Sequence, residues 1–472
     1  MQDHLRDRNR AALLSCVQNR RLDDHTRDAT RVKYYSQDRI SSLPEDIVAN
    51  ILSRLTMKEA MRTSILSSKW RLLFWTHFSG SLDFDASPLI FKIHKKLVRE
   101  PTEAKRMDFV NWVNTTLECI QSPTIEGFRV GFDVKSKPDL DTWISFAVSK
   151  RAKSLELDLT KIELSSNLFG RFLFPAHLIS GPNTNIACLS SLCLKNVDVT
   201  EEALDSILTH CTSLEVLRLH DTVALKRFRI SDPSITLKCL ELTRCNCLED
   251  VEISGVNLVS FKFIGLEVDI RYTNVPRLAK LSFGALYLNQ VIYQQLEQVI
   301  RFRLQLQILI LDVNSDWMAD VFPKYIPEFT NLKHFELGSS IGAEDHSLLP
   351  FTSLLKASPL LQKFTVKALF RWAPNPPPYT EFANHLSEHV YPCLKVVEFK
   401  GFMGFPAEIQ MLFHLLESAP ALEKLTIDAC RPRYLGSTLE PIARELEECR
   451  NARLRAVELQ PKIPPGIDFM VI

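Results

Sequence analysis

The sequence LEVLRLHDT, residues 214–222, decides how most of this chain folds. Its apolar residues stand in the order apolar-x-x-apolar-x-apolar, and the alternation over its second half is typical of a short β-strand with one buried face. At this apolar content a single copy arises often by chance. The repetition of the pattern along the chain is therefore what carries structural information.

Thirteen segments of the chain match this pattern, and eleven of them begin with leucine. Most successive segments begin 20 to 37 residues apart, which brackets the period of leucine-rich repeats. Two intervals, from 237 to 248 and from 248 to 258, are too short for a strand and a helix. The segments begin at residues 125, 152, 189, 214, 237, 248, 258, 278, 306, 332, 361, 394 and 422.

The ninth residue of a leucine-rich repeat is usually Asn or Cys, which satisfies backbone groups of the turn. Cys245, Asn314 and Cys430 occupy this position, while Thr222 and Ser340 place a hydroxyl there. Between the predicted strands, four segments have a helical period and would form a convex layer: 200–211, 289–302, 351–358 and 407–420. We therefore predict an α/β fold, with an irregular leucine-rich repeat solenoid over residues 125–370.

Residues 38–75, DRISSLPEDIVANILSRLTMKEAMRTSILSSKWRLLFW, contain three short helical patterns upstream of the repeats. The spacing Thr56-x-x-Glu59 matches a capping box and predicts the start of the second helix. Ser67 or Ser68 can cap the third. Three helices in about 40 residues bury too little apolar surface to be stable alone, so this unit is expected to leave apolar surface for a partner.

This segment resembles the F-box of plant F-box proteins. The resemblance lies in Leu43-Pro44-Glu45, in Ile51-Leu52-Ser53-Arg54-Leu55 and in Ser67-Ser68-Lys69-Trp70. It implies an F-box over residues 38–80 that binds a Skp-type adaptor and, through it, a cullin. The residues that would form the adaptor surface or the internal core of the F-box are Leu43, Pro44, Ile47, Ile51, Leu52, Leu55, Trp70 and Trp75. Sequence does not divide them, although Leu43 and Pro44 are the contacts most expected.

Three further segments complete the predicted domain organisation. Residues 1–37 are rich in Arg, Asp and Gln without an apolar period and predict a disordered extension. Residues 81–124 predict a helical linker, because 106–120 is amphipathic. After a proline-rich break, residues 380–472 resemble the FBD region that closes many plant F-box proteins, and would cap the solenoid.

Composition limits the classes of partner. The chain of 472 residues has 57 Lys and Arg against 56 Asp and Glu, so no global charge favours nucleic acid or an anionic membrane. No window approaches the ~20 apolar residues of a membrane span, and the N-terminus lacks the apolar stretch of a secretory signal. With 11 cysteines, an odd number, reduced thiols are expected. We expect a soluble protein of the cytoplasm, the nucleus or both.

The sequence contains no nucleophile elbow, no phosphate-binding glycine loop and no zinc-protease motif, so no catalytic motif supports an enzyme. Cys239, Cys245 and Cys247 lack the second paired ligand set of a structural zinc site, so no metal is predicted. His210 and His220 have no nucleophile associated with them by spacing. No cofactor is predicted. An enzyme with a dispersed active site, or a solenoid holding a small molecule under its loops, has no motif in its favour.

The resemblance instead implies a non-catalytic substrate receptor of a Skp-cullin-F-box (SCF) ubiquitin ligase, with a scaffold outside any ligase as the alternative. The target protein would bind the concave sheet, where the residue between the last two apolar positions of each strand points away from the core. These residues include Arg129, Glu156, Arg218, Glu241, Glu252, Lys262, Glu336 and Glu398. Five acids against three bases do not make a nucleic-acid surface, and these charges could instead simply solvate the sheet.

Overall fold

The computed structural model describes residues 42–86, 103–160, 171–179, 186–313, 321–339, 347–368, 389–435 and 440–472. The predicted extension, residues 1–37, and the proline-rich break at 371–379 lie outside these residues. The chain divides into two units, Met1–Pro44 and Glu45–Ile472. Every helix and strand described below belongs to the second unit.

The second unit begins with the three predicted helices. They are α2 (Glu45–Ser53), α3 (Met57–Thr63) and α4 (Ser68–His77), and both α2 and α3 contact α4. The predicted capping box is present, because the Glu59 backbone N–H donates to Thr56 Oγ1 and the Thr56 N–H donates to the Glu59 carboxylate. Ser67 caps α4, because its Oγ accepts the Trp70 backbone N–H at 3.3 Å. The buried core of this bundle is formed by Val48, Leu52, Met57, Ala60, Trp70, Leu73 and Phe74.

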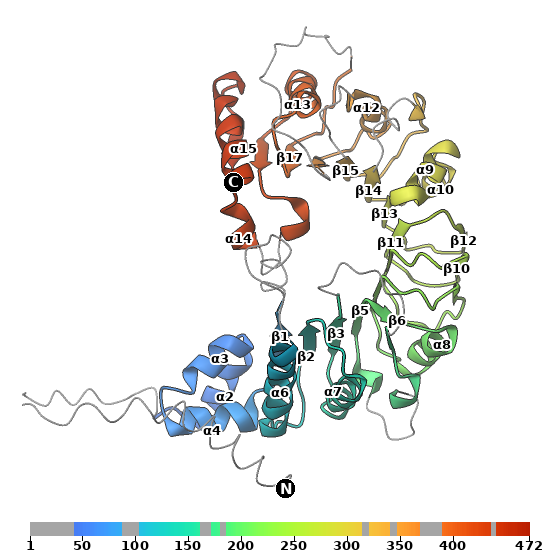
Figure 1. Ribbon diagram of the computed structural model, residues 1–472. Coiled ribbons are helices and arrows are strands. Elements are labelled where there is room, and N and C mark those ends of the chain that lie inside the picture. The colour runs from blue at the N-terminus through green and yellow to red at the C-terminus, as the bar shows by residue number, and fades with distance from the viewer. Residues whose placement is uncertain are drawn as a thin grey trace, which may run out of the picture. The chain divides into compact units, whose positions relative to one another are not determined.

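A parallel sheet of 14 strands follows the helical bundle (Figure 1). Every strand is parallel to its neighbours, as expected for repeats that return in the same direction. In order across the sheet, its strands are β1 (Ser81–Asp85), β2 (Gly127–Gly131), β3 (Ser154–Asp158), β5 (Ser191–Lys195), β7 (Val216–His220), β9 (Cys239–Thr243), β11 (Ser260–Gly265), β13 (Lys280–Gly284), β14 (Ile308–Val313), β15 (His334–Ser339), β16 (Lys363–Ala368), β17 (Val396–Lys400), β18 (Lys424–Asp428) and β19 (Asp468–Val471).

All thirteen sequence matches form strands, and each strand begins two residues after the first residue of its match. The match at 214 gives β7, in which Leu217 and Leu219 are fully buried. They align with Leu240 and Leu242 of β9, so the apolar positions form continuous rows across the sheet. The predicted α/β leucine-rich repeat fold is confirmed.

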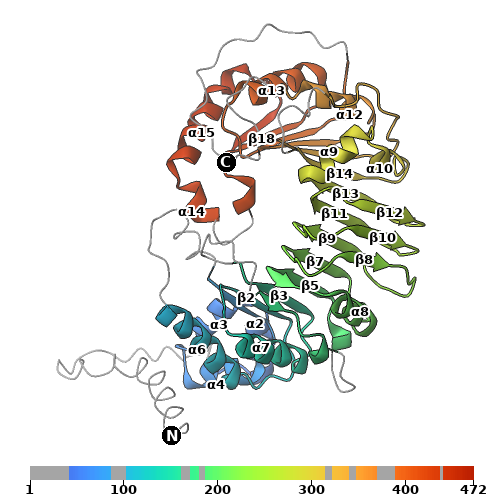
Figure 2. The same ribbon diagram turned by 45° about the vertical axis from the view of Figure 1, so that its right-hand side comes forward.

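The two short intervals have a structural explanation. A second parallel sheet contains β8 (Arg227–Ile230), β10 (Asp250–Ser254) and β12 (Asp269–Thr273), with β10 in the centre. Between residues 216 and 284 the chain alternates between the two sheets, so a strand replaces the helix of these repeats (Figure 2). The match at 248 therefore belongs to the second sheet, and the matches at 237 and 258 are consecutive strands of the large sheet.

Helices cover one side of the large sheet elsewhere (Figures 1 and 2). They include α6 (Glu103–Cys119), α7 (Lys137–Ser149), α8 (Glu201–His210), α9 (Ala285–Tyr293), α10 (Glu297–Ile300), α12 (Thr352–Lys356) and α13 (Pro406–Ser418). The chain ends with α14 (Glu440–Arg444), α15 (Glu447–Glu458) and β19. We call the side of the large sheet opposite the covering helices the open face. Along β1 to β18, the second and fourth residues of its strands are buried against the helices and the second sheet, so the first, third and fifth lie on the open face.

Two segments differ from their predicted organisation. Residues 81–124, predicted as a helical linker, contain α6 but begin with β1, which pairs with β2. Residues 380–472 contribute β17, β18 and β19 to the same large sheet, with α13 between the first two. The resemblance of this last segment to an FBD region stays a prediction.

The ninth repeat position has the expected use at Cys245 and Thr222. The Cys245 thiol lies 3.5 Å from the carbonyl oxygen of Leu219, on a neighbouring strand. Thr222 Oγ1 accepts the Val199 backbone N–H at 3.0 Å. Both side chains are buried and satisfy backbone groups of adjacent turns, as this position requires. Asn314 and Ser340 lie outside the described residues.

Candidate functional site

The three-helix bundle exposes several large apolar side chains. Ile47 on α2 is 42% exposed, and Leu72 on α4 is 62% exposed; between α3 and α4, Ile65 and Leu66 are 79% and 52% exposed. We call these four residues the exposed apolar set. A bundle of three short helices with so much apolar surface in water is typical of a module that binds a partner.

The residues predicted for adaptor binding fall into three groups. Leu52 and Trp70 are 0% and 3% exposed and belong to the internal core of the bundle. Ile51, Leu55 and Trp75 are half-buried, whereas Ile47 is exposed. In the first unit, Pro44 is exposed and Leu43 half-buried. The structure therefore divides the set that sequence left undivided.

Three members of the exposed apolar set, Ile65, Leu66 and Leu72, were missed by sequence reasoning. Ile65 and Leu66 lie in the turn between α3 and α4, where no helical period assigns a face. Leu72 lies between Trp70 and Leu73 in sequence, both of which are buried in the bundle. The adjacent apolar pair Ile65 and Leu66 just before the Ser67 cap was the available signal.

The open face has one row formed by the third residue of each strand. The register aligns Arg129 with Glu156 and Arg218 with Glu241, and the alignment continues strand by strand. The complete row is Asp83, Arg129, Glu156, Cys193, Arg218, Glu241, Lys262, Ser282, Ile310, Glu336, Thr365, Glu398, Thr426 and Met470. All of the predicted target-facing residues except Glu252 lie in this row.

The prediction that Glu252 shares this surface is wrong. Glu252 lies on β10 in the second sheet, where its carboxylate is 3.8 Å from Arg229 and 3.7 Å from Arg271. The apolar pattern of β10 is the same as that of the large-sheet strands, so the pattern alone cannot tell which sheet a strand joins. The short interval before and after this segment was the only sequence sign of a difference.

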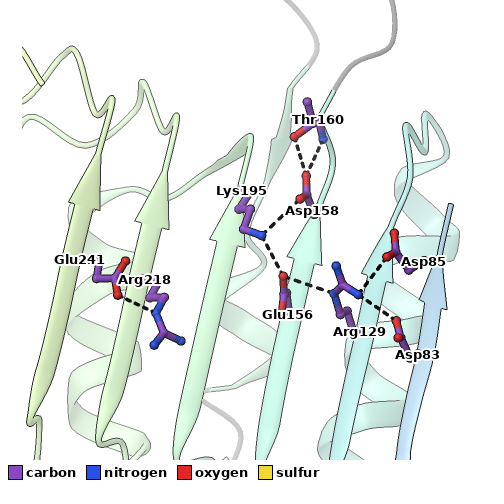
Figure 3. A network of polar contacts seen from close by, with 9 residues as sticks. All are labelled: Asp83, Asp85, Arg129, Glu156, Asp158, Thr160, Lys195, Arg218 and Glu241. Atoms are coloured by element: carbon purple, nitrogen blue, oxygen red, sulfur yellow. Dashed lines mark hydrogen bonds and ion pairs between the residues drawn. The ribbon is translucent and has the colours of Figure 1, made fainter. Parts of the chain in front are cut away.

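Ion pairs cross the strands at the β1 end of the open face (Figure 3). Arg129 Nη1 lies 3.2 Å from Asp83 and 3.1 Å from Asp85, and its Nε lies 3.4 Å from Glu156. Lys195 Nζ lies 2.9 Å from the same Glu156 and 3.3 Å from Asp158. Two cations thus bridge four carboxylates over strands β1, β2, β3 and β5.

The pKa shifts in this network follow from burial and neighbouring charge. Burial raises the pKa of the Asp83 carboxyl, and Asp85 adds to the rise, although Arg129 opposes it. Burial alone would lower the pKa of Arg129, but the surrounding carboxylates, with Asp85 the largest contributor, outweigh burial and raise it. The same balance raises the pKa of Lys195, mainly through Asp158. Both cations therefore hold their charge throughout the physiological pH range.

The next part of the face has more cations than carboxylates. Arg218 Nε lies 2.9 Å from Glu241 (Figure 3), and Lys262 Nζ lies 3.8 Å from the same carboxylate. Burial would raise the pKa of Glu241, but these two cations lower it overall. Burial, helped by Lys195 and Lys262, lowers the pKa of His220 to about 4, so this imidazole is neutral at neutral pH.

Strands β14 to β17 carry a third group of ion pairs, which links acids and lysines across several strands. Lys363 Nζ lies 2.7 Å from Glu398, and Lys400 lies 3.7 Å from both Glu398 and Glu336. Lys367 lies 3.6 Å from Glu336 and 3.5 Å from Asp312. Half-buried pairs of this kind fix side-chain positions more than they add stability. The open face is therefore a patterned, ordered surface.

Among the residues that the structure describes, no group of three or more His, Cys, Asp and Glu is arranged to hold a metal ion. Cys245 is occupied in a turn, and His210 Nδ1 contacts the Ser206 carbonyl oxygen at 2.9 Å within its own helix. None of the helices in the described ranges has the length and apolar character needed to cross a membrane.

Comparison with known proteins agrees with this architecture. Residues 40–77 match the F-box domain model, and residues 124–472 match the model of the At1g61320/AtMIF1 LRR domain. F-box/FBD/LRR-repeat protein At1g13570 of Arabidopsis thaliana is 25% identical over 434 residues, covering 84% of this chain and 92% of that protein. F-box/LRR-repeat protein At2g42720 of the same plant is 24% identical over 470 residues, covering 89% of this chain and 100% of that protein.

The matched ranges coincide with the structural division. The F-box match ends at residue 77, where α4 ends, and the repeat match begins three residues before β2 and ends with the last residue of the chain. The repeat-domain model alone covers well over half of the 472 residues. The chain therefore belongs to the plant F-box/LRR-repeat family, with a leucine-rich repeat domain of the At1g61320/AtMIF1 type.

Proposed function

We propose that this protein is a substrate receptor of an SCF ubiquitin ligase. The F-box binds a Skp-type adaptor and, through it, a cullin, while the open face of the repeat sheet binds a target protein. The chain itself is non-catalytic and acts by holding the target near a separate conjugating enzyme, so its contribution to rate is proximity. The cytoplasm and the nucleus are the compartments in which we expect this assembly.

The observation that carries the proposal is the exposed apolar set on a bundle that matches the F-box domain. Ile65 and Leu72 are both more than half exposed, and neither contributes to the buried core of the bundle. Large aliphatic side chains that become desolvated at the centre of an interface supply much of its binding energy. Adaptor binding gives these side chains a partner and explains why the bundle leaves them outside.

The connection between the bundle and the sheet supports a bridging role. Only Phe78, Ser79 and Gly80 separate α4 from β1, and the ring of Phe78 packs 5.2 Å from that of Phe74. The Gln121 N–H donates to the Trp75 carbonyl oxygen at 2.8 Å, and the Glu126 N–H donates to that of Ser79 at 2.8 Å. A target on the sheet would therefore keep a fixed position relative to a bound adaptor.

Affinity purification of the full chain in the presence of a proteasome inhibitor tests this proposal. We expect the wild type to co-purify with a Skp-type adaptor, a cullin and a target protein whose cellular level rises when the chain is deleted. The Leu72→Asp variant should lose adaptor and cullin but keep the target. Adaptor binding without any protein that accumulates on deletion would favour the scaffold alternative, and absence of the adaptor would refute both.

A further inference from the structure

Charge is unevenly distributed along the open face. The outward positions of β1, β2, β3 and β5 carry four carboxylates, Asp83, Asp85, Glu156 and Asp158, and two cations, Arg129 and Lys195, a net charge of −2. The Asp85 side chain is 2% exposed, so its charge lies just beneath the surface. We call these six residues the acidic patch. The outward residues of β7, β9, β11 and β13 include Arg218, Glu241, Lys262 and Lys280, a net charge of +2. We call these four residues the basic patch.

The ion pairs do not cancel the opposite net charges of the two patches. In the acidic patch, each cation is shared among two or three carboxylates, so the carboxylates remain in excess. In the basic patch, Arg218 and Lys262 share one carboxylate, that of Glu241. Lys280 forms no ion pair with any residue in the described ranges. Figure 3 shows the ion pairs of the acidic patch and, beyond them, the Arg218–Glu241 pair of the basic patch.

Strands β14 to β18 of the same face give an internal comparison. The outward residues of strands β14 to β18 include the carboxylates Asp312, Glu336, Glu398 and Asp428 and the lysines Lys363, Lys367, Lys400 and Lys424, which balance. A face that only needed to be soluble could be balanced throughout, as this part is. The separation of opposite charges on eight neighbouring strands calls for a different explanation.

We propose that the open face of β1 to β13 binds an extended target segment that has a basic block and an acidic block about six residues apart. The basic block lies over the acidic patch and the acidic block over the basic patch. The inference rests on the proposed function, because it names the chemical class of the target segment bound by the same face.

The spacing follows from strand geometry. Neighbouring strands are about 4.8 Å apart, and the centres of the two patches are four strands apart, so they lie about 19 Å from one another. An extended peptide advances about 3.3 Å per residue, so about six residues span this distance. The segment crosses the strands and contacts side chains only. Charge complementarity of this kind gives orientation and partner selection more than raw affinity.

Fluorescence anisotropy with two synthetic peptides tests the inference. The block peptide has four lysines, a Gly-Ser spacer and four glutamates, which places the block centres six residues apart. The alternating peptide has the same composition with Lys and Glu interleaved. We expect the full chain to bind the block peptide about tenfold more tightly at low salt. The preference should vanish near 1 M salt, where the Debye length is about 3 Å.

Charge-swap variants provide the matched controls. The double variant Asp83→Lys with Lys280→Glu makes both patches neutral without changing the net charge of the chain, and it should lose the preference. The double variant Lys424→Glu with Asp468→Lys swaps an exposed pair, 3.9 Å apart, outside both patches and should keep it. If the first variant fails to fold, Asp83→Asn with Lys280→Gln should halve the net charge of each patch and reduce the preference for the block peptide.

Equal binding of the two peptides by the folded wild type would overturn the inference, as would a preference that survives neutralisation of both patches. Adaptor binding is measured on the same preparation. A chain that binds the adaptor but shows no preference for the block peptide refutes the proposed basic and acidic blocks of the target segment and leaves the ligase role intact. A chain with the preference but no adaptor binding refutes the ligase role alone.

Discussion

Replacing either of two exposed apolar residues of the F-box by aspartate should strongly weaken adaptor binding without unfolding the protein. Ile65 and Leu72 are 79% and 62% exposed. Folding therefore buries little of either side chain, and we expect Ile65→Asp and Leu72→Asp each to change the free energy of unfolding by about 1 kcal/mol or less. Circular dichroism during urea unfolding measures this quantity.

The effect on binding should be far larger. Complete burial of such a side chain at an interface contributes about 1.5–3 kcal/mol, and an aspartate left unpaired there adds a desolvation penalty. We expect each variant to weaken adaptor binding by about 2–4 kcal/mol, which is roughly 30- to 1000-fold in Kd. Isothermal titration calorimetry with a purified Skp-type adaptor measures the loss.

Two control variants separate this effect from general damage. Leu304 is 65% exposed, comparable to Leu72, but it lies in the repeat domain, so Leu304→Asp should leave adaptor affinity unchanged. Leu52 is fully buried, and Leu52→Ala should cost about 2–5 kcal/mol of stability through a cavity. Wild-type affinity in both Ile65→Asp and Leu72→Asp would refute the assignment of the exposed apolar set to adaptor binding.

Three further predictions concern other sites. Charged residues at Leu43 and Pro44 should abolish adaptor pull-down while the thermal unfolding midpoint stays within ~2 °C of the wild type; retained pull-down would count against a contact there. Arg129→Met should lower the free energy of unfolding by about 1–3 kcal/mol, because the Asp85 side chain is 2% exposed and loses a charged partner; urea unfolding that matches the wild type would show the ion pair to be unimportant. Burial raises the pKa of Glu408 from 4.5 to about 7, so its proton is held more tightly in the folded state. The contribution of Glu408 to the free energy of unfolding is fully present below pH 4.5 and falls by about 3 kcal/mol as pH rises through 7. Glu408→Gln should remove this fall, as measured by urea unfolding at several pH values. A pH dependence that Glu408→Gln leaves unchanged would contradict the assignment.

The strands of the large sheet were predictable because their signal is local. An alternation of apolar residues such as that of Leu217 and Leu219 requires only that one face of a strand be buried. Which sheet a strand joins is not local information. β10 pairs with β8 and with β12, each about 20 residues away along the chain, and the apolar pattern around Glu252 is the same as that of the large-sheet strands.

β1 was missed for a similar reason. Its sequence SLDFD alternates, but Ser79 stands where a repeat match opens with an apolar residue. β1 pairs with β2, more than 40 residues later in the chain. The strand is therefore fixed by a long-range partner, and the sequence segment was assigned to a linker.

The F-box surface was only partly predictable. A helical stripe places Ile47, Ile51 and Leu52 on one side of α2, but such a stripe does not say which residues meet α4 and which meet water. The tertiary packing buries Leu52 and exposes Ile47. The turn residues Ile65 and Leu66 follow no period, so their exposure required the packed bundle.

Hydrogen–deuterium exchange of the full chain, with and without a purified Skp-type adaptor, tests the central claim most directly. The account predicts that the adaptor slows exchange in residues 42–77 and leaves the strands from β2 to β18 unchanged, because the two binding surfaces are separate. Unchanged exchange in residues 42–77, or slower exchange confined to the strands of the open face, would contradict it.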